Sequence, residues 1–190
     1  MAKKKKGQTM SEATTQETPV VPAPEVTGVP KLESDPLTIA RTRAFHNRPY
    51  FAPALLALRF VPTPDMRKKA MGPIGVDKFG RCYYDPEWVK EVDNEELTGV
   101  LYHEVGHWLH DHAGRCSFRN PAGFNIAGDL ELNDDLCSEP DVKMPDFVIT
   151  PKKMGLEDNL IAEQYYEQLS QKAQDGARMK CDCGSVADGE

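Results

Sequence analysis

The segment from Asp93 to about His112 constrains the fold of this 190-residue chain more than any other. It begins with an aspartate suited to cap a helix, and Glu96 follows three residues later, close to a capping box. Apolar residues then recur around most of the circumference of a helix: Leu97, Val100, Leu101, Val105, Trp108 and Leu109. A helix that is apolar nearly all round belongs inside a domain. We therefore expect a central, buried helix that ends near His112.

Two histidines on this helix form a pattern that favours metal binding. His103 and His107 are four residues apart, so they lie on one face of the helix, one turn apart. Their imidazoles can converge on one zinc ion, and Glu104 lies beside that point, placed to accept a proton from water. The alternative is a pair of hydrogen-bonded core histidines beside a buried, unpaired glutamate, which is costly. The sequence therefore predicts a zinc site on this helix.

A catalytic zinc ion takes three protein ligands and keeps one position for water, so a third ligand is needed. In the metzincin arrangement, position 110 would be glycine and position 113 histidine. This chain has His110 and Ala113 instead, which excludes that class. We therefore expect the third ligand on a second helix.

The segment 125–133 offers candidates for this ligand. Asp129 is the first choice, because Asp129 and Asn133 lie on one face of a helix and Asn133 is placed to hydrogen-bond a ligand. Glu131 points elsewhere on the wheel and is the second choice. Gly128 costs the helix about 1 kcal/mol relative to alanine, which favours a close approach of a neighbour at this point.

Four further residues are candidates for contact with a substrate. Histidines at the end of a helix are favoured by its dipole, so His110 and His112 are expected to be exposed there. Tyr83 and Tyr84 lie on an expected strand, either as core aromatics or along a cleft that pairs with an extended peptide. The residue that stabilises an oxyanion stays open among these four: Tyr83, Tyr84, His110 and His112.

The remaining chain separates into an arm, a domain and a tail. Residues 1–34 are low in hydrophobicity and rich in proline, which predicts a disordered arm. Residues 35–172 show the patterns of a mixed α+β domain, and residues 173–190 those of a flexible tail or the start of a linker. Within the domain we expect helices over 35–48, 87–92, 124–136 and 159–172, strands over 58–61 and on both sides of a 77–80 turn, and a linker or strand over 145–151.

Charge and composition exclude several classes of partner. The net charge of −7 argues against a nucleic-acid-binding surface, and the basic cluster Lys3–Lys6 is interpreted as a solubilising start to the arm. No apolar run reaches the roughly 20 residues of a membrane-spanning helix, and we expect no signal peptide, because the residues after the basic start are polar. Five scattered cysteines, Cys181 and Cys183 in the tail among them, are typical of reduced thiols. We predict a cytoplasmic protein with neither nucleic acid nor membrane as partner.

These segments together resemble a known family. The stretch 103–107, followed by 125–129 and 132–133, is similar to the metallopeptidase domain found N-terminal to von Willebrand factor A-like domains in bacterial and phage proteins. The similarity extends over about residues 36–170. It implies a zincin-like fold with a central helix, a second ligand-bearing helix and a small sheet. It also implies a von Willebrand factor A-like partner domain beyond this chain.

The resemblance implies zinc bound by His103, His107 and Asp129, with Glu104 as general base. Zinc would lower the pKa of a bound water towards 7 and polarise a carbonyl, while Glu104 passes the proton to the leaving amine. We therefore predict a zinc metallopeptidase acting on a protein or peptide. Two alternatives stay open: a catalytically weak, zinc-stabilised binding module coupled to a partner domain, and a dedicated hydrolase of another amide.

Overall fold

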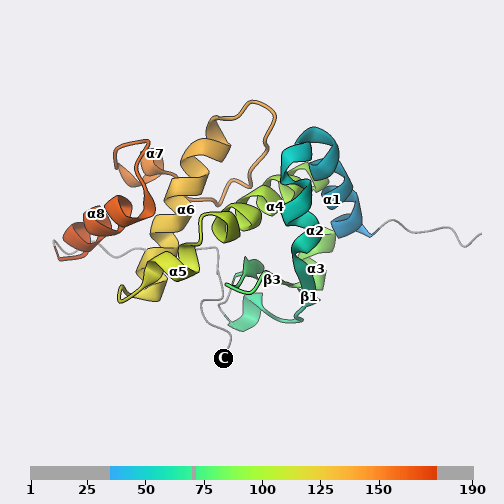
Figure 1. Ribbon diagram of the computed structural model, residues 1–190, viewed down its shortest axis with the longest axis horizontal. Helices are drawn as coiled ribbons and strands as arrows, with labels where there is room; N and C mark the ends of the chain where they lie inside the picture. Colours follow the sequence, from blue (N-terminus) through green and yellow to red (C-terminus); the bar gives the residue numbers. More distant parts are fainter. Residues whose placement is uncertain (1–34, 70–71, 175–190) are drawn as a thin grey trace, which may run out of the picture. The chain divides into compact units, whose positions relative to one another are not determined.

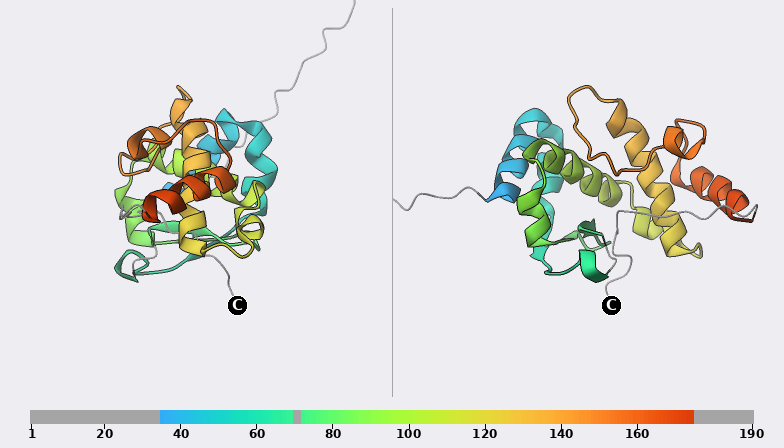
Figure 2. Two further views of the ribbon diagram at one scale, coloured as in Figure 1. Left: turned by 90° about the vertical axis from the view of Figure 1, so that its left-hand side faces the viewer. Right: turned by 180° about the vertical axis from the view of Figure 1, so that it is seen from behind.

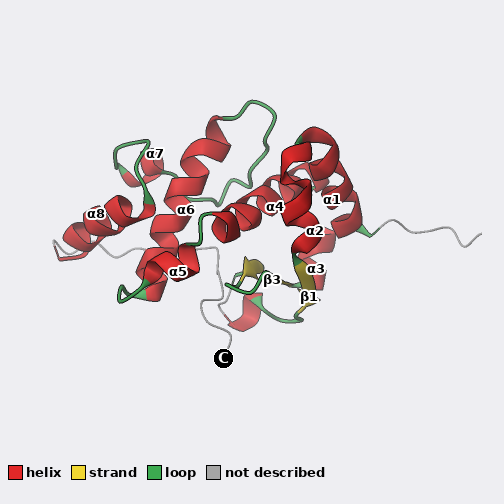
Figure 3. Cartoon of the chain, in the orientation of Figure 1, coloured by secondary structure: helices red, strands yellow, loops and turns green. Residues whose placement is uncertain are grey.

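The computed structural model describes residues 35–69 and 72–174, which belong to the compact unit Ser34–Glu190. These residues form a helix-rich α+β structure with a small sheet, as expected (Figures 1 and 3). No helix among them is long and apolar enough to cross a membrane. The expected arm 1–34 lies outside the described residues, as does the expected tail apart from residues 173 and 174, which end the last helix.

Helices make up most of the described residues. The α-helices are α1 (Pro36–Asn47), α2 (Ala52–Ala57), α3 (Pro86–Glu91), α4 (Asn94–Leu109), α5 (His112–Cys116), α6 (Pro121–Ser138), α7 (Pro151–Met154) and α8 (Ala162–Gln174). Two 3₁₀ turns are η1 (Pro49–Phe51) and η2 (Arg67–Lys69). The strands are β1 (Arg59–Pro62), β2 (Ile74–Val76) and β3 (Arg81–Tyr84).

Helix α4 is the central element. Its cap is the expected one, because a carboxylate oxygen of Asp93 accepts hydrogen bonds from the backbone N–H groups of Glu95 and Glu96 at 2.9 and 3.3 Å. Every residue from Leu97 to His107 is buried. The helix packs against α1, α6 and β2 (Figure 1). The predicted buried central helix is thus confirmed.

The end of α4 differs from the expectation. The helix stops at Leu109 rather than near His112, because Asp111 takes the left-handed conformation, with φ 50° and ψ 43°. Aspartate tolerates this conformation, and its side chain competes for backbone N–H groups. Here Asp111 accepts a hydrogen bond from the N–H of Gly114 at 3.2 Å and begins α5. The chain turns back, so that His112 lies against α4 instead of extending it.

The sheet has the order β1-β3-β2, with β1 parallel and β2 antiparallel to β3. The expected turn 77–80 joins β2 to β3. One oxygen of the buried Asp77 carboxylate accepts hydrogen bonds from the N–H groups of Phe79 and Arg81 at 2.9 and 3.0 Å, which closes this turn. Strand β2 is therefore an edge strand that lies against α4.

Helix α6 lies between α4 and α8 (Figure 2). It begins at Pro121, three residues before the expected start, because Asn120 caps the N–H of Gly123 at 2.9 Å and proline is well tolerated at the first helical position. One apolar core surrounds α4, and a second lies between α6 and α8. Residues 145–150 form a loop, not a strand, and α8 begins at Ala162 rather than near residue 159.

A Gly→Ala pair tests the close packing of α4. A Cβ atom on Gly99 would overlap the carbonyl oxygen of Lys143, which belongs to the backbone and has little freedom to move. A Cβ on Gly106 would meet Cδ2 of Leu132 at 2.7 Å, and that side chain can shift. We expect Gly99→Ala to lower the free energy of unfolding by about 1–3 kcal/mol despite better helix propensity, and Gly106→Ala to lower it less. Equal losses in urea titrations would contradict this packing.

Candidate metal centre

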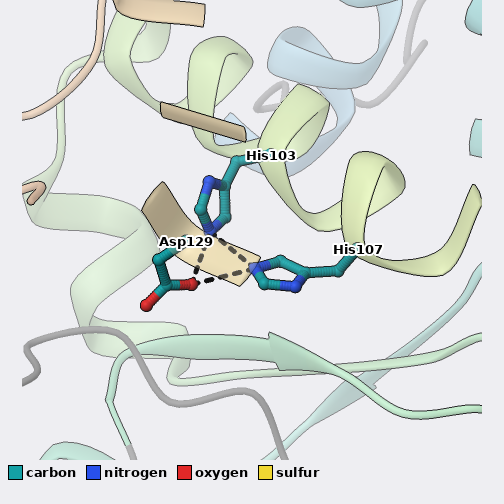
Figure 4. Close-up of side chains that lie close together, drawn as sticks. All are labelled: His103, His107 and Asp129. Atoms are coloured by element: carbon teal, nitrogen blue, oxygen red, sulfur yellow. Dashed lines mark hydrogen bonds and ion pairs between the residues drawn. The ribbon is translucent and has the colours of Figure 1, made fainter. Parts of the chain in front are cut away.

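Three side chains converge where α4 and α6 cross: His103 and His107 from α4, and Asp129 from α6 (Figure 4). The Nε2 atom of His107 lies 2.9 Å from Nε2 of His103 and 2.9 Å from Oδ1 of Asp129. The distance from His103 Nε2 to Asp129 Oδ1, which completes the triangle of donor atoms, is 3.3 Å. Metal bonds of about 2.0–2.1 Å in a tetrahedral site put donor atoms roughly 3.3 Å apart, so these groups are able to hold a metal ion.

The hydrogen bonds behind His103 determine its tautomer. Nδ2 of Asn133 donates to the carbonyl oxygen of Ile149 at 2.8 Å, which orients the amide and turns Oδ1 towards His103. That Oδ1 lies 2.9 Å from His103 Nδ1. Because Oδ1 can only accept, Nδ1 of His103 carries the hydrogen and Nε2 presents a lone pair to the site. Asn133 thus makes a hydrogen bond to His103, one of the predicted ligands.

A third histidine, His112, fixes the tautomer of His107 in the same way as Asn133 fixes that of His103. Its Nδ1 lies 2.9 Å from Nδ1 of His112, and Nε2 of His112 lies 3.3 Å from Oε2 of Glu131. A carboxylate accepts only, so Nε2–H of His112 donates to Glu131 and Nδ1 of His112 is left as an acceptor. His107 must then donate through Nδ1–H. Its Nε2 also presents a lone pair to the site.

In these tautomers the converging atoms are two imidazole nitrogens, each with a lone pair, and one carboxylate oxygen. Burial, and next the charge of His103, lowers the pKa of His107 to about 4, which keeps this ring neutral at pH 7. Burial opposes ionisation of Asp129, but the two adjacent imidazoles hold its pKa below the usual value. A metal ion or a proton stabilises three electron-pair donors at such distances. Burial opposes protonation of His103, but the adjacent Asp129 raises the pKa of this ring above its usual value.

Glu104 lies one residue beyond His103 and is 2% exposed. One of its carboxylate oxygens accepts a hydrogen bond from the backbone N–H of Val76 on β2. The other, Oε2, has no hydrogen-bond partner among the described residues. Burial raises the pKa of Glu104 to about 7. A buried carboxylate with one unsatisfied oxygen and a pKa near neutrality is suited to accept and return a proton.

Glu131, the second candidate for the third ligand, is not part of this group. Its carboxylate instead pairs with His110 at 2.8 Å and with Arg115 at 3.2 Å. Although burial opposes ionisation, these partners and His112 hold the pKa of Glu131 well below its usual range. The structure thus brings Asp129, rather than Glu131, to the two histidines.

The four residues considered for substrate contact are the histidines at positions 110 and 112 and the tyrosines at positions 83 and 84. His110 is partly exposed, with 42% of its side chain accessible, as expected. His112 is only 5% exposed, so the expectation of an exposed histidine is wrong for it; the turn at Asp111 carries it inward. The hydroxyl of Tyr83 donates to Asp77 at 3.3 Å, and Tyr84 packs against the main core.

The sequence contains one signal for the inward position of His112. A Cβ atom on Gly128 would lie 2.6 Å from Nδ1 of His112, so this ring fills the space that the glycine leaves. The close approach of a neighbour expected at Gly128 is confirmed, and the approaching group is the imidazole of His112.

Two pockets adjoin the converging side chains. One is lined by His107 and His112, and the other, which is largely apolar, by His103 and Glu104. The cavity volume is about 40 Å³ in the first and about 20 Å³ in the second. Each has room for water beside the converging side chains.

A comparison with protein families bears on this arrangement. The profile of a family described as "Putative metallopeptidase domain" matches residues 33–189. This chain belongs to that family. None of the curated proteins and none of the solved structures matches the chain. Membership in the metallopeptidase-domain family confirms the resemblance drawn from residues 103–107 and 125–133, and it points to a metal-dependent hydrolase.

The buried charge of Glu104 has a measurable cost. Its pKa is raised from 4.5 to about 7 in the folded protein, so the unfolded chain releases this proton at lower pH. Wild-type protein then loses stability as the pH rises from about 4.5 to about 7, and the loss is constant above that. At pH 8 in a metal chelator, we expect Glu104→Gln to be more stable than wild type by about 3 kcal/mol, from about 1.4 kcal/mol per pKa unit.

This gain should disappear below about pH 4, where both states of the wild type are protonated. Glu95→Gln is the matched control, because Glu95 lies on the same helix with 61% of its side chain exposed. Its effect should be within about 1 kcal/mol. Chelator-treated Glu104→Gln that is less stable than wild type at pH 8 would show that Glu104 is not held as an unsatisfied buried acid.

Proposed function

We propose that this chain is a zinc-dependent hydrolase with a zincin-like fold, and that it cleaves peptide bonds. Zinc would be held by Nε2 of His103, Nε2 of His107 and Oδ1 of Asp129. The observation that carries the proposal is the convergence of these three atoms, together with the neighbouring Glu104, whose buried Oε2 has no hydrogen-bond partner among the described residues. Two imidazoles and one carboxylate form a donor set that suits zinc and leaves a position for water.

Each residue has a separate role in this proposal. Zinc supplies a Lewis acid that lowers the pKa of water towards 7 and polarises a carbonyl oxygen. Glu104 takes a proton from the attacking water at Oε2 and delivers it to the leaving nitrogen. Burial raises the pKa of Glu104, which favours the protonated form that returns the proton. Asn133 keeps the ring of His103 in the tautomer that this chemistry requires.

Zinc content tests the ligand set. We expect purified protein to contain about one zinc ion per chain, and His103→Ala or His107→Ala to lose it, because two remaining ligands do not make a stable site. Asp129→Ala should weaken zinc binding substantially. His46→Ala is the matched control, since His46 is exposed on α1, and it should retain zinc. Wild-type protein that stays metal-free after refolding with zinc would refute the proposal.

Turnover tests the general base. We expect Glu104→Gln to bind zinc with wild-type affinity and to lose peptide hydrolysis, because this carboxylate acts on a proton rather than on the metal. Because a partner domain is expected to bring the substrate to this site, wild-type protein alone should cleave unstructured casein slowly while still binding a hydroxamate chelator. Full zinc occupancy without chelator binding would favour a structural zinc ion. Rapid cleavage of many proteins, lost in Glu104→Gln, would establish a broad endopeptidase.

A further inference from the structure

His112 occupies a position that the proposed chemistry does not explain. It is buried at the start of α5 and bridges two elements, with Nδ1 at 2.9 Å from His107 and Nε2 at 3.3 Å from Glu131. Glu131 is held in turn by Arg115, whose Nε donates to Oε1 of Glu163 on α8 at 3.0 Å. A continuous series of hydrogen bonds therefore runs from His107 through α5 and α6 to α8.

Three residues in and beside this series, His110, His112 and Glu131, also form a possible second metal site. Their ligand atoms lie close enough together for a cation. The carboxylate of Glu131, however, already accepts from both histidines, from two nitrogens of Arg115 at 3.2 and 3.5 Å, and from the N–H of Ala162 at 2.6 Å. Five donors saturate a carboxylate, and a cation would have to displace a guanidinium. The cluster of His110, His112, Glu131 and Arg115 therefore connects α5, α6 and α8 by hydrogen bonds and does not form a second metal site.

Backbone features on both sides make room for the ring of His112. Asp111, in the left-handed conformation, turns the chain back towards α4. Gly114 is required there, because a Cβ at this position would overlap the Asp111 carboxylate. Gly128 leaves the space against α6 that Nδ1 of His112 occupies. Three residues on two elements thus serve the placement of one imidazole.

We propose that His112 is a positioning residue for the metal centre. Its Nδ1 accepts the hydrogen of His107 Nδ1, which keeps the lone pair of His107 Nε2 directed at the metal, and Glu131 keeps His112 itself in the accepting tautomer. Metal-bound histidines usually donate their second nitrogen to a carboxylate or a carbonyl, and loss of that acceptor costs roughly 10–100-fold in metal affinity. Here an imidazole stands between the ligand and the carboxylate. This inference rests on the proposed zinc site.

Two substitutions of His112 separate positioning from packing. In His112→Leu the volume is similar but the acceptor is gone, so zinc affinity, measured by competition with a chromophoric chelator, should fall roughly 10–100-fold. In His112→Asn, Oδ1 takes the place of the ring Nδ1, so affinity should stay within about tenfold of wild type. The visible spectrum of the Co²⁺-substituted protein should match wild type for His112→Asn and change for His112→Leu. Equal zinc affinity in wild type and His112→Leu would overturn the inference, as would an Asn variant as weak as the Leu variant.

Gly128→Ala gives an independent test that leaves His112 in place and decides the matter if His112→Leu does not fold. The added methyl displaces the ring, so zinc affinity should fall by a similar factor. Gly123→Ala is the control on the same helix: its Cβ would meet the edge of Tyr166 at 3.1 Å, outside the cluster, and affinity should not change. Wild-type affinity in Gly128→Ala would contradict the proposal. If wild-type protein itself binds no zinc, the proposed function fails rather than this inference.

Discussion

At the crossing of α4 and α6, two imidazole nitrogens and one carboxylate oxygen meet within 3.3 Å, and the tautomers favoured by the neighbouring residues turn both nitrogen lone pairs towards the centre. Such a group repels itself unless a cation joins it, and burial prevents water from screening the repulsion. The hydrogen bonds that produce this situation come from outside the trio: Asn133 and His112 each take one hydrogen from the ring nitrogen that faces away from the centre. Asn133 is held in turn by the carbonyl of Ile149, and His112 by the carboxylate of Glu131.

This requirement explains features that are costly when considered alone. Glycine at position 128 weakens a helix, and aspartate at position 111 adopts a conformation with positive φ, yet together they bring His112 to His107. Glu104 is a buried acid with an unsatisfied oxygen. Residues that lower stability in this way gather at functional sites, where the rest of the fold maintains them. The two apolar cores on either side of α6 provide that support.

Much of the site follows from helical periodicity alone. The spacing of His103 and His107, the cap at Asp93 and the apolar surface of α4 are local properties, and so is the shared face of Asp129 and Asn133. The sequence could not show that α4 ends at Leu109, because a left-handed aspartate is selected by the hydrogen bonds available around it. For that reason the exposed position expected for His112 is wrong. Its burial depends on Gly128, 16 residues later in the chain, and on the approach of α8 through Glu131, which are tertiary contacts rather than patterns.

X-ray absorption at the zinc edge of the zinc-loaded protein tests the central claim most directly, because it reports the donor atoms themselves. The account predicts a first shell of nitrogen and oxygen at about 2.0–2.1 Å, with the outer-shell scattering of two imidazoles and no sulfur. The five cysteines make sulfur ligation a real alternative. A zinc–sulfur distance of about 2.3 Å, or scattering from fewer than two imidazoles, would contradict a metal centre formed by His103, His107 and Asp129.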